Sequence, residues 1–242
     1  MSVCWNFSLV GLAVTFILAL GAVVAAVAFG PSLVEAFAPF EGEAIRRRVP
    51  SRLTFGIGSA VAVAGVTIAV LGAGSVGWLP AYLYLTIVGV LLAAVDARVH
   101  RLPDAIVLPS YPILAALLGV AAVIDRINYG HWADGQWKAS ARASEALVGA
   151  AVLLIFFGLL HLIPRSGLGL GDVKLVGLLG AALGWVSLSL VPLGLVLGIL
   201  SAGLWAAFLL ATGRANRSDP IPYGPHLLLG AFLALLAGAV GA

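Results

Sequence analysis

Long apolar stretches dominate this sequence, and each is about as long as a helix must be to cross a membrane. Crossing the hydrocarbon core takes roughly 20 residues. Eight such stretches follow one another, at 8–29, 54–74, 79–96, 105–124, 144–163, 173–190, 191–211 and 225–241. Only 10% of the 242 residues are charged, whereas a soluble domain averages about 25%. We therefore predict an all-α fold, a polytopic transmembrane bundle of about eight helices.

The residue types inside and between these stretches narrow the function further. Gly and Ala are abundant in the apolar segments, and small residues let helices approach closely in lipid, so we expect a compact bundle. The single cysteine, Cys4, excludes an intrachain disulfide framework and a Cys-based zinc site. No His, Asp or Glu cluster has metal-ligand spacing and no basic stripe suits nucleic acid. We therefore predict that the protein binds neither a metal nor a cofactor. We also predict that it is embedded in the lipid bilayer.

The basic residues are distributed unevenly between alternate loops. Ten of them fall on one side, namely Arg46, Arg47, Arg48, Arg52, Arg98, Arg101, Arg165, Lys174, Arg214 and Arg217, and three on the other, namely Arg126, Lys138 and Arg142. Cytoplasmic loops carry the excess of Lys and Arg, so the first side is predicted to be cytoplasmic. With eight helices, both termini then lie outside.

A first polar motif, Asp96-Ala97-Arg98-Val99-His100-Arg101-Leu102-Pro103-Asp104, interrupts two apolar stretches on the predicted cytoplasmic side. Asp96 ends a helix, where its charge opposes the helix dipole and a capping role cannot explain it. A carboxylate at a membrane boundary is costly and usually functional. Asp104 follows Pro103 and precedes a helix, which favours a structural N-cap.

A second motif, Gly169-Leu170-Gly171-Asp172-Val173-Lys174, opens a helix on the same side. Glycines without Cβ atoms allow the backbone to bend and to approach a substrate closely. Asp172 alone is explained equally well as a helix cap or as a functional group. The helix dipole would favour its ionised form, and therefore Asp172 as base and Asp96 as acid. Lys174 is either a membrane-boundary anchor or an electrostatic partner of the two aspartates.

Two carboxylates on one membrane face are suited to peptide hydrolysis. One must be ionised to activate water, and the other must be protonated to donate to the carbonyl oxygen. Carboxylates in contact reach this state because both cannot easily be charged at once. We therefore predict that Asp96 and Asp172 form a catalytic pair.

The motifs resemble those of the type IV prepilin peptidases, which are aspartic proteases of the bacterial inner membrane. Asp96 followed by Leu102-Pro103-Asp104 is similar to the family's first active-site region. Gly169, Gly171, Asp172 and Lys174 are similar to the second, and Ile221-Pro222-Tyr223-Gly224-Pro225 resembles the turn that opens its last helix. The resemblance covers about residues 80–242.

The resemblance implies Asp96 and Asp172 as catalytic residues and Leu102, Pro103, Asp104, Gly169, Gly171 and Lys174 as supporting residues. It also implies prepilins or pilin-like secretion subunits as substrates, which carry a short basic leader before a hydrophobic helix. Cleavage would occur at the cytoplasmic face of the bacterial cytoplasmic membrane.

One departure from the family lies near the N-terminus. Many members carry a cytoplasmic domain with two Cys-x-x-Cys pairs between their first two helices and also methylate the new N-terminus. The segment 31–53 here is short and has no cysteine, so we expect no N-methyltransferase activity. We divide the chain into 1–53, a transmembrane helix with a basic cytoplasmic loop, and 54–242, the membrane-embedded peptidase core.

Three alternatives remain open from the sequence. A transporter or ion relay would also use intramembrane carboxylates and glycine-interrupted helices, but no internal repeats are visible. A non-catalytic platform for pilus assembly would tolerate Asn at both aspartates. A presenilin-like protease shares Gly-x-Gly-Asp, but its first aspartate typically follows Tyr, whereas Val95 precedes Asp96 here.

Overall fold

The protein is a bundle of α-helices. The computed structural model describes residues 9–37, 52–72, 76–129, 138–163, 168–214, 216 and 222–240. Within this part of the chain lie eight α-helices: α1 (Leu9–Phe37), α2 (Arg52–Gly72), α3 (Leu79–Val99), α4 (Asp104–Tyr129), α5 (Lys138–His161), α6 (Leu170–Val186), α7 (Leu190–Ala211) and α8 (Gly224–Val240). A short 3-10 helix, η1 (Val76–Trp78), leads into α3. The predicted all-α fold is confirmed.

Among the described residues, six helices are long and apolar enough to cross a membrane, namely α1 to α5 and α7, with α3 counted together with η1. Helices α6 and α8 are shorter, at 17 residues each. The chain is therefore a multi-pass membrane protein in which two short helices complete the bundle.

Several predicted boundaries needed correction. Helix α4 ends at Tyr129 and not at residue 124, and α5 begins at Lys138 and not at residue 144. Helix α1 continues past Pro31 to Phe37, beyond the predicted end at residue 29, and residues 38–51 lie outside the described part. The turn between α6 and α7 was predicted near Pro192 but lies at residues 187–189. Pro192 is in the first turn of α7 instead, where the missing N–H would have had no intrahelical partner.

Glycines allow the closest helix contacts, as the abundance of small residues predicts. A Cβ on Gly180 of α6 would collide with the backbone of Gly149 in α5, and one on Gly184 would collide with the backbone of Glu145. Gly230 of α8 approaches the backbone of Gly198 in α7 in the same way. These pairs of helices are in backbone contact, so even alanine would push them apart.

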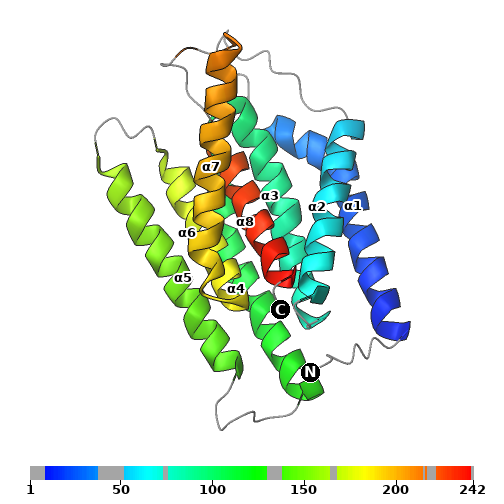
Figure 1. Cartoon of the computed structure of the whole chain (residues 1–242). Coiled ribbons are helices and arrows are strands. Elements are labelled where there is room, and N and C mark those ends of the chain that lie inside the picture. The colour runs from blue at the N-terminus through cyan, green and yellow to red at the C-terminus, as the bar shows by residue number, and fades with distance from the viewer. Residues whose placement is uncertain are drawn as a thin grey trace.

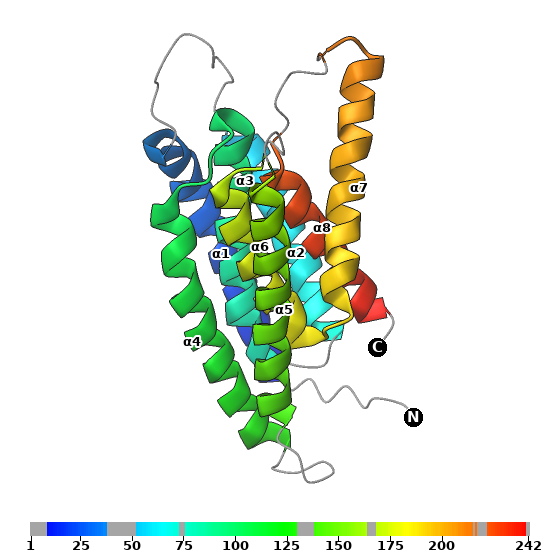
Figure 2. The ribbon, with the colours of Figure 1, turned by 90° about the vertical axis from the view of Figure 1, so that its left-hand side faces the viewer.

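Helices α3, α6 and α8 form the centre of the bundle (Figures 1 and 2). Helix α3 contacts α1, α2, α4 and α8, and α6 contacts α4, α5, α7 and α8. Consecutive helices alternate in direction, so the C-terminal end of α3 meets the N-terminal ends of α4, α6 and α8 at one end of the molecule (Figure 1, top). Both aspartate motifs lie at this end, as the topology predicts.

A polar cluster fixes the opposite end of the bundle. Trp78 Nε1 donates to Asp125 Oδ2 at 2.8 Å, and Arg142 forms a 3.1 Å ion pair with the same oxygen. The Arg142 guanidinium also lies 4.6 Å from the centre of the Trp78 ring. Since these residues come from η1, α4 and α5, the cluster sets where α3 begins relative to its neighbours.

Candidate active site

Asp96 lies in the last turn of α3 and is almost fully buried, with 4% of its surface exposed. The helix ends immediately afterwards because His100 adopts a left-handed conformation, with φ of 53°. The His100 N–H then donates to the Asp96 carbonyl oxygen at 2.8 Å. This C-cap ends α3 one turn beyond Asp96, so that the chain can reverse towards Leu102 and Pro103.

The Asp96 carboxylate is held by the start of α8. Its Oδ2 accepts the backbone N–H of Gly224 at 2.9 Å. Gly224 is the first residue of α8, whose first N–H groups have no partner inside the helix. A Cβ at this position would lie 2.8 Å from Asp96 Oδ2, so the contact requires glycine. The Pro-Tyr-Gly-Pro element thus contributes to the site, although Gly224 was not among the predicted site residues.

Asp172 lies in the first turn of α6 and is also buried, with 8% of its surface exposed. Its Oδ2 accepts the N–H of Gly169, the N-cap residue, at 3.2 Å. Asp172 therefore caps its helix, and the capping and functional interpretations are compatible. Asp172 lies just before residue 173, where the predicted apolar stretch begins. Helix α6 is not among the six helices long enough to cross the membrane.

Burial and the charge of Asp96 together raise the pKa of Asp172 from 3.8 to about 6, against the opposing effect of the Gly169 N–H. Loss of solvent thus acts on the Asp172 pKa in the opposite direction to the helix N-terminus, and which of the two aspartates is the base stays a prediction. The Asp96 charge is one cause of this raised pKa, so the two carboxyl groups interact electrostatically. That they form a catalytic pair stays a prediction.

Gly171 joins the two motifs. A Cβ on Gly171 would lie 2.8 Å from Leu102 Cβ and 3.3 Å from the Leu102 backbone N and O. Leu102 is buried, and Pro103 next to it accepts N–H bonds from Ile106 and Val107 at the start of α4. The Leu-Pro-Asp turn therefore packs directly on the Gly-x-Gly-Asp turn, which places Asp172 relative to the end of α3.

Lys174 and Asp104 form an ion pair between α6 and α4. Lys174 Nζ lies 2.7 Å from both carboxylate oxygens of Asp104. Tyr111 of α4 adds a hydrogen bond from its hydroxyl to the Lys174 carbonyl oxygen at 2.5 Å. Asp104 is the first residue of α4, and Pro103 before it supplies the carbonyl oxygen of the first helical bond, so the predicted N-cap role is wrong. The Asp104 carboxylate instead pairs across helices. The described structure pairs Lys174 with Asp104 rather than with the two buried aspartates.

His161 is a further residue whose position the sequence did not reveal. It is the last residue of α5. Its Nδ1 is 2.7 Å from the carbonyl oxygen of Leu168, immediately before Gly169. His161 therefore holds the segment that leads into the second motif.

The site thus has two buried carboxyl groups, from the end of α3 and the start of α6, and a backbone donor from α8. Among the described residues, no group of three or more His, Cys, Asp or Glu side chains could hold a metal ion. The carboxyl pair itself is suited to moving a proton to and from a bound carbonyl group or water molecule. The absence of a cofactor requirement stays a prediction.

Comparison with known proteins places the site inside a family match. The model of the type IV leader peptidase family matches residues 83–240, which is more than half of the chain and includes both aspartates, both motifs and Gly224. No solved structure matches the chain.

Several similar proteins are named prepilin leader peptidase/N-methyltransferase. The protein of Pseudomonas aeruginosa strain PAO1 is 31% identical over 61% of this chain and 46% of its own length. That of Aeromonas hydrophila is 33% identical over 65% of this chain and 49% of its own length. That of Bacillus subtilis strain 168 is 27% identical over 66% of this chain and 56% of its own length. The matched region thus spans about half the length of these relatives.

Proposed function

Because the chain belongs to the type IV leader peptidase family, we propose that Asp96 and Asp172 hydrolyse the peptide bond that joins a leader peptide to a prepilin or pilin-like subunit. The observation that carries the proposal is the pairing of two buried carboxyl groups at one end of the bundle, within electrostatic reach of each other. Family membership supports the leader peptide as substrate, and so do the names of the similar proteins.

The raised pKa of Asp172 supports its role as the group that holds the proton. Asp96, whose Oδ2 accepts the Gly224 N–H, is then the ionised base. It takes a proton from water, and the resulting hydroxide oxygen bonds to the scissile carbonyl carbon. Asp172 gives its proton to the carbonyl oxygen. As the tetrahedral intermediate collapses, Asp172 takes a proton back from one of its hydroxyl groups and the C–N bond breaks. The departing amine takes the proton that Asp96 removed from water, so both carboxyl groups return to their starting states. These roles are the reverse of those that the helix dipole alone suggests.

The site faces the cytoplasm in this proposal. Arg98, Arg101, Lys174 and Arg214 belong to the end of the bundle that carries the aspartates, whereas Arg142 belongs to the other. The positive-inside rule then orients the site inward. A leader with basic residues would remain in the cytoplasm while the following hydrophobic helix enters the membrane, so the scissile bond would lie at the level of Asp96 and Asp172.

The position of the carboxyl groups favours hydrolysis over the alternatives. A transporter or ion relay needs polar groups near the middle of the membrane, whereas Asp96 and Asp172 lie at helix ends. We also propose that the chain lacks N-methyltransferase activity, because the segment before α2 contains no Cys-x-x-Cys pair.

Coexpression with a panel of tagged prepilins tests the peptidase proposal. Leader removal is scored by gel shift and mass spectrometry for the wild type, Asp96→Asn and Asp172→Asn, with membrane levels of each protein measured. The proposal requires cleavage by the wild type and none by either variant at equal membrane levels. Cleavage by either Asn variant would contradict the paired mechanism, and pilus assembly supported by both would favour the platform alternative.

A further inference from the structure

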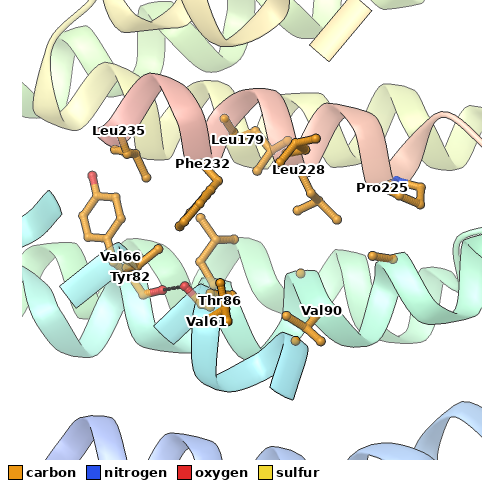
Figure 3. A pocket seen from close by; sticks show the side chains of 17 residues that line it. Val61, Val66, Tyr82, Thr86, Val90, Leu179, Pro225, Leu228, Phe232 and Leu235 are labelled. Atoms are coloured by element: carbon orange, nitrogen blue, oxygen red, sulfur yellow. Dashed lines mark hydrogen bonds between the residues drawn. The ribbon is translucent and has the colours of Figure 1, made fainter. Parts of the chain in front are cut away.

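An apolar groove of about 420 Å³ lies between α2, α3 and α8 (Figure 3). Leu228 and Phe232 of α8 face Val61 of α2 and Val90 of α3 across it (Figure 3). Its polar side chains are already satisfied, because Thr86 Oγ1 donates to the Tyr82 carbonyl oxygen at 2.7 Å and the Tyr82 hydroxyl donates to the Ala182 carbonyl oxygen at 2.6 Å. The groove therefore suits a ligand that makes no hydrogen bonds.

One end of the groove adjoins Asp96. Ala93, which lines it, is one helical turn before Asp96, and Pro225 directly follows Gly224, the residue that donates to Asp96. From Tyr82 to Ala93 the groove extends about 16 Å along α3, at about 1.5 Å per residue. The groove therefore extends from the neighbourhood of Asp96 towards the middle of the bundle.

Helix α2 opens the groove at the end nearest Asp96. Further from that end, Gly65 lies against the Phe232 ring, and a Cβ on Gly72 would be 2.9 Å from Ala239 Cβ, so α2 and α8 are in contact there. A Cβ on Gly58, by contrast, would meet no atom within 4 Å. The two helices therefore separate towards Gly58 and leave space beside the site.

We propose that this groove binds one face of the apolar helix that follows the scissile bond, and that α2 determines which side chains are accepted. The inference rests on the proposed peptidase function. Its occupant is identified by the absence of free polar groups in the walls and by continuity with Asp96. A helix face presents side chains at positions i, i+3, i+4 and i+7 to such a groove. Helix α2 lies outside residues 83–240, so this wall is not part of the family match.

Filling the open space at Gly58 tests the proposal. Two membrane-inserted model substrates share a basic leader and an apolar helix of about 20 residues. They differ only in the first two turns after the cut, which are rich in Leu and Phe in one and in Ala in the other. Gly58→Leu is compared with Gly119→Leu, because a Cβ at Gly119, on α4 away from the groove, also meets nothing within 4 Å.

We expect Gly58→Leu to lower kcat/KM for the Leu/Phe substrate by about tenfold and for the Ala substrate by much less. The substrate preference would then shift towards small side chains. Gly119→Leu is expected to keep the wild-type preference. If Gly58→Leu also keeps the wild-type substrate preference, or if both glycine variants change it equally, the groove does not bind the substrate helix.

Photocrosslinking separates this proposal from the peptidase proposal and from lipid binding. A benzophenone amino acid replaces Val61, which is 62% exposed beside the groove, or Val120 of α4, which is 54% exposed elsewhere. Both are made in the Asp172→Asn protein with the Leu/Phe substrate. Labelling of the substrate from position 61 and not from 120 supports the groove. Labelling of lipid alone from both positions would overturn it, even if the wild type cleaves. If the wild type cleaves neither substrate, the peptidase proposal fails for these substrates, and the crosslink still decides the groove.

Discussion

Gly171→Ala should lower kcat far more than Gly169→Ala, although both glycines belong to one motif. The new Cβ at position 171 would lie 2.8 Å from Leu102 Cβ, 0.6 Å closer than the 3.4 Å at which ordinary contact begins. The backbone N and O of Leu102, at 3.3 Å, are also close. Leu102 directly precedes Pro103, whose carbonyl oxygen accepts the first N–H bonds of α4, so this backbone resists displacement. The start of α6 must therefore shift away from Leu102 and carry Asp172 with it.

The size of this effect follows from the displacement. A misplacement of about 1 Å in a catalytic group can cost a hundredfold in rate, so a shift of at least 0.6 Å should lower kcat between about ten- and a hundredfold. Overpacking should also lower the free energy of unfolding by about 1–3 kcal/mol. At Gly169 the backbone is extended, with φ of −75° and ψ of 149°, and a Cβ would lie 3.5 Å from Asp172 Oδ2. Gly169→Ala should therefore retain most of the activity.

The assay measures kcat and KM for a cleaved prepilin with each purified variant in detergent, alongside thermal unfolding. The Gly171→Ala loss should appear mainly in kcat, since the change acts on the placement of Asp172. Equal losses for the two alanine variants would refute the reasoning, because the contact with Leu102 would then not position the site.

The other predictions concern the carboxyl pair and its supports. Gly224→Ala should lower kcat strongly at unchanged membrane levels, because its Cβ would lie 2.8 Å from Asp96 Oδ2; wild-type kcat would rule out the contact. The Asp172 pKa of about 6 predicts that kcat falls as the pH rises through about 6 and the pair loses its shared proton; a flat profile from pH 5 to 8 would contradict this. Because that pKa is higher in the folded protein than in the unfolded chain, the free energy of unfolding decreases as the pH rises from about 4 to 6. Asp172→Asn should then be more stable than the wild type at pH 7.5 but not at pH 4, as measured by thermal unfolding. Lys174→Met and Asp104→Asn should each cost less than about tenfold in kcat, since both partners are partly exposed; the double variant should be no worse than either single one, and additive losses would show that the two residues act separately.

Much of the fold could be predicted because lipid restricts what a chain can do. A backbone in hydrocarbon must satisfy its hydrogen bonds within each segment, so every long apolar stretch becomes a helix. Alternation of eight helices then placed Asp96 and Asp172 at the same end, without any contact information. The end of α1 was missed because Pro31 suggests a stop, whereas the helix continues through it to Phe37.

The site was predictable only as a set of chemical groups. Charged residues are rare in this apolar chain, so the sequence alone draws attention to four of them, namely Asp96, Asp104, Asp172 and Lys174. Whether Lys174 serves the two aspartates or another partner depends on helix rotation, which no local pattern records. The described structure pairs it with Asp104 across 70 residues of sequence.

The sequence by itself determined the helices, the membrane setting, and the end of the bundle where the aspartates lie, because these follow from the hydrophobicity and spacing of neighbouring residues. Only the tertiary structure decided that Gly224 donates to Asp96, that Gly171 lies against Leu102, and that α2 separates from α8 beside the site. Those contacts join residues far apart in the chain, and each depends on how closely two backbones can approach. How closely two backbones approach depends on the packing of both helices, so the sequence of one segment does not determine it.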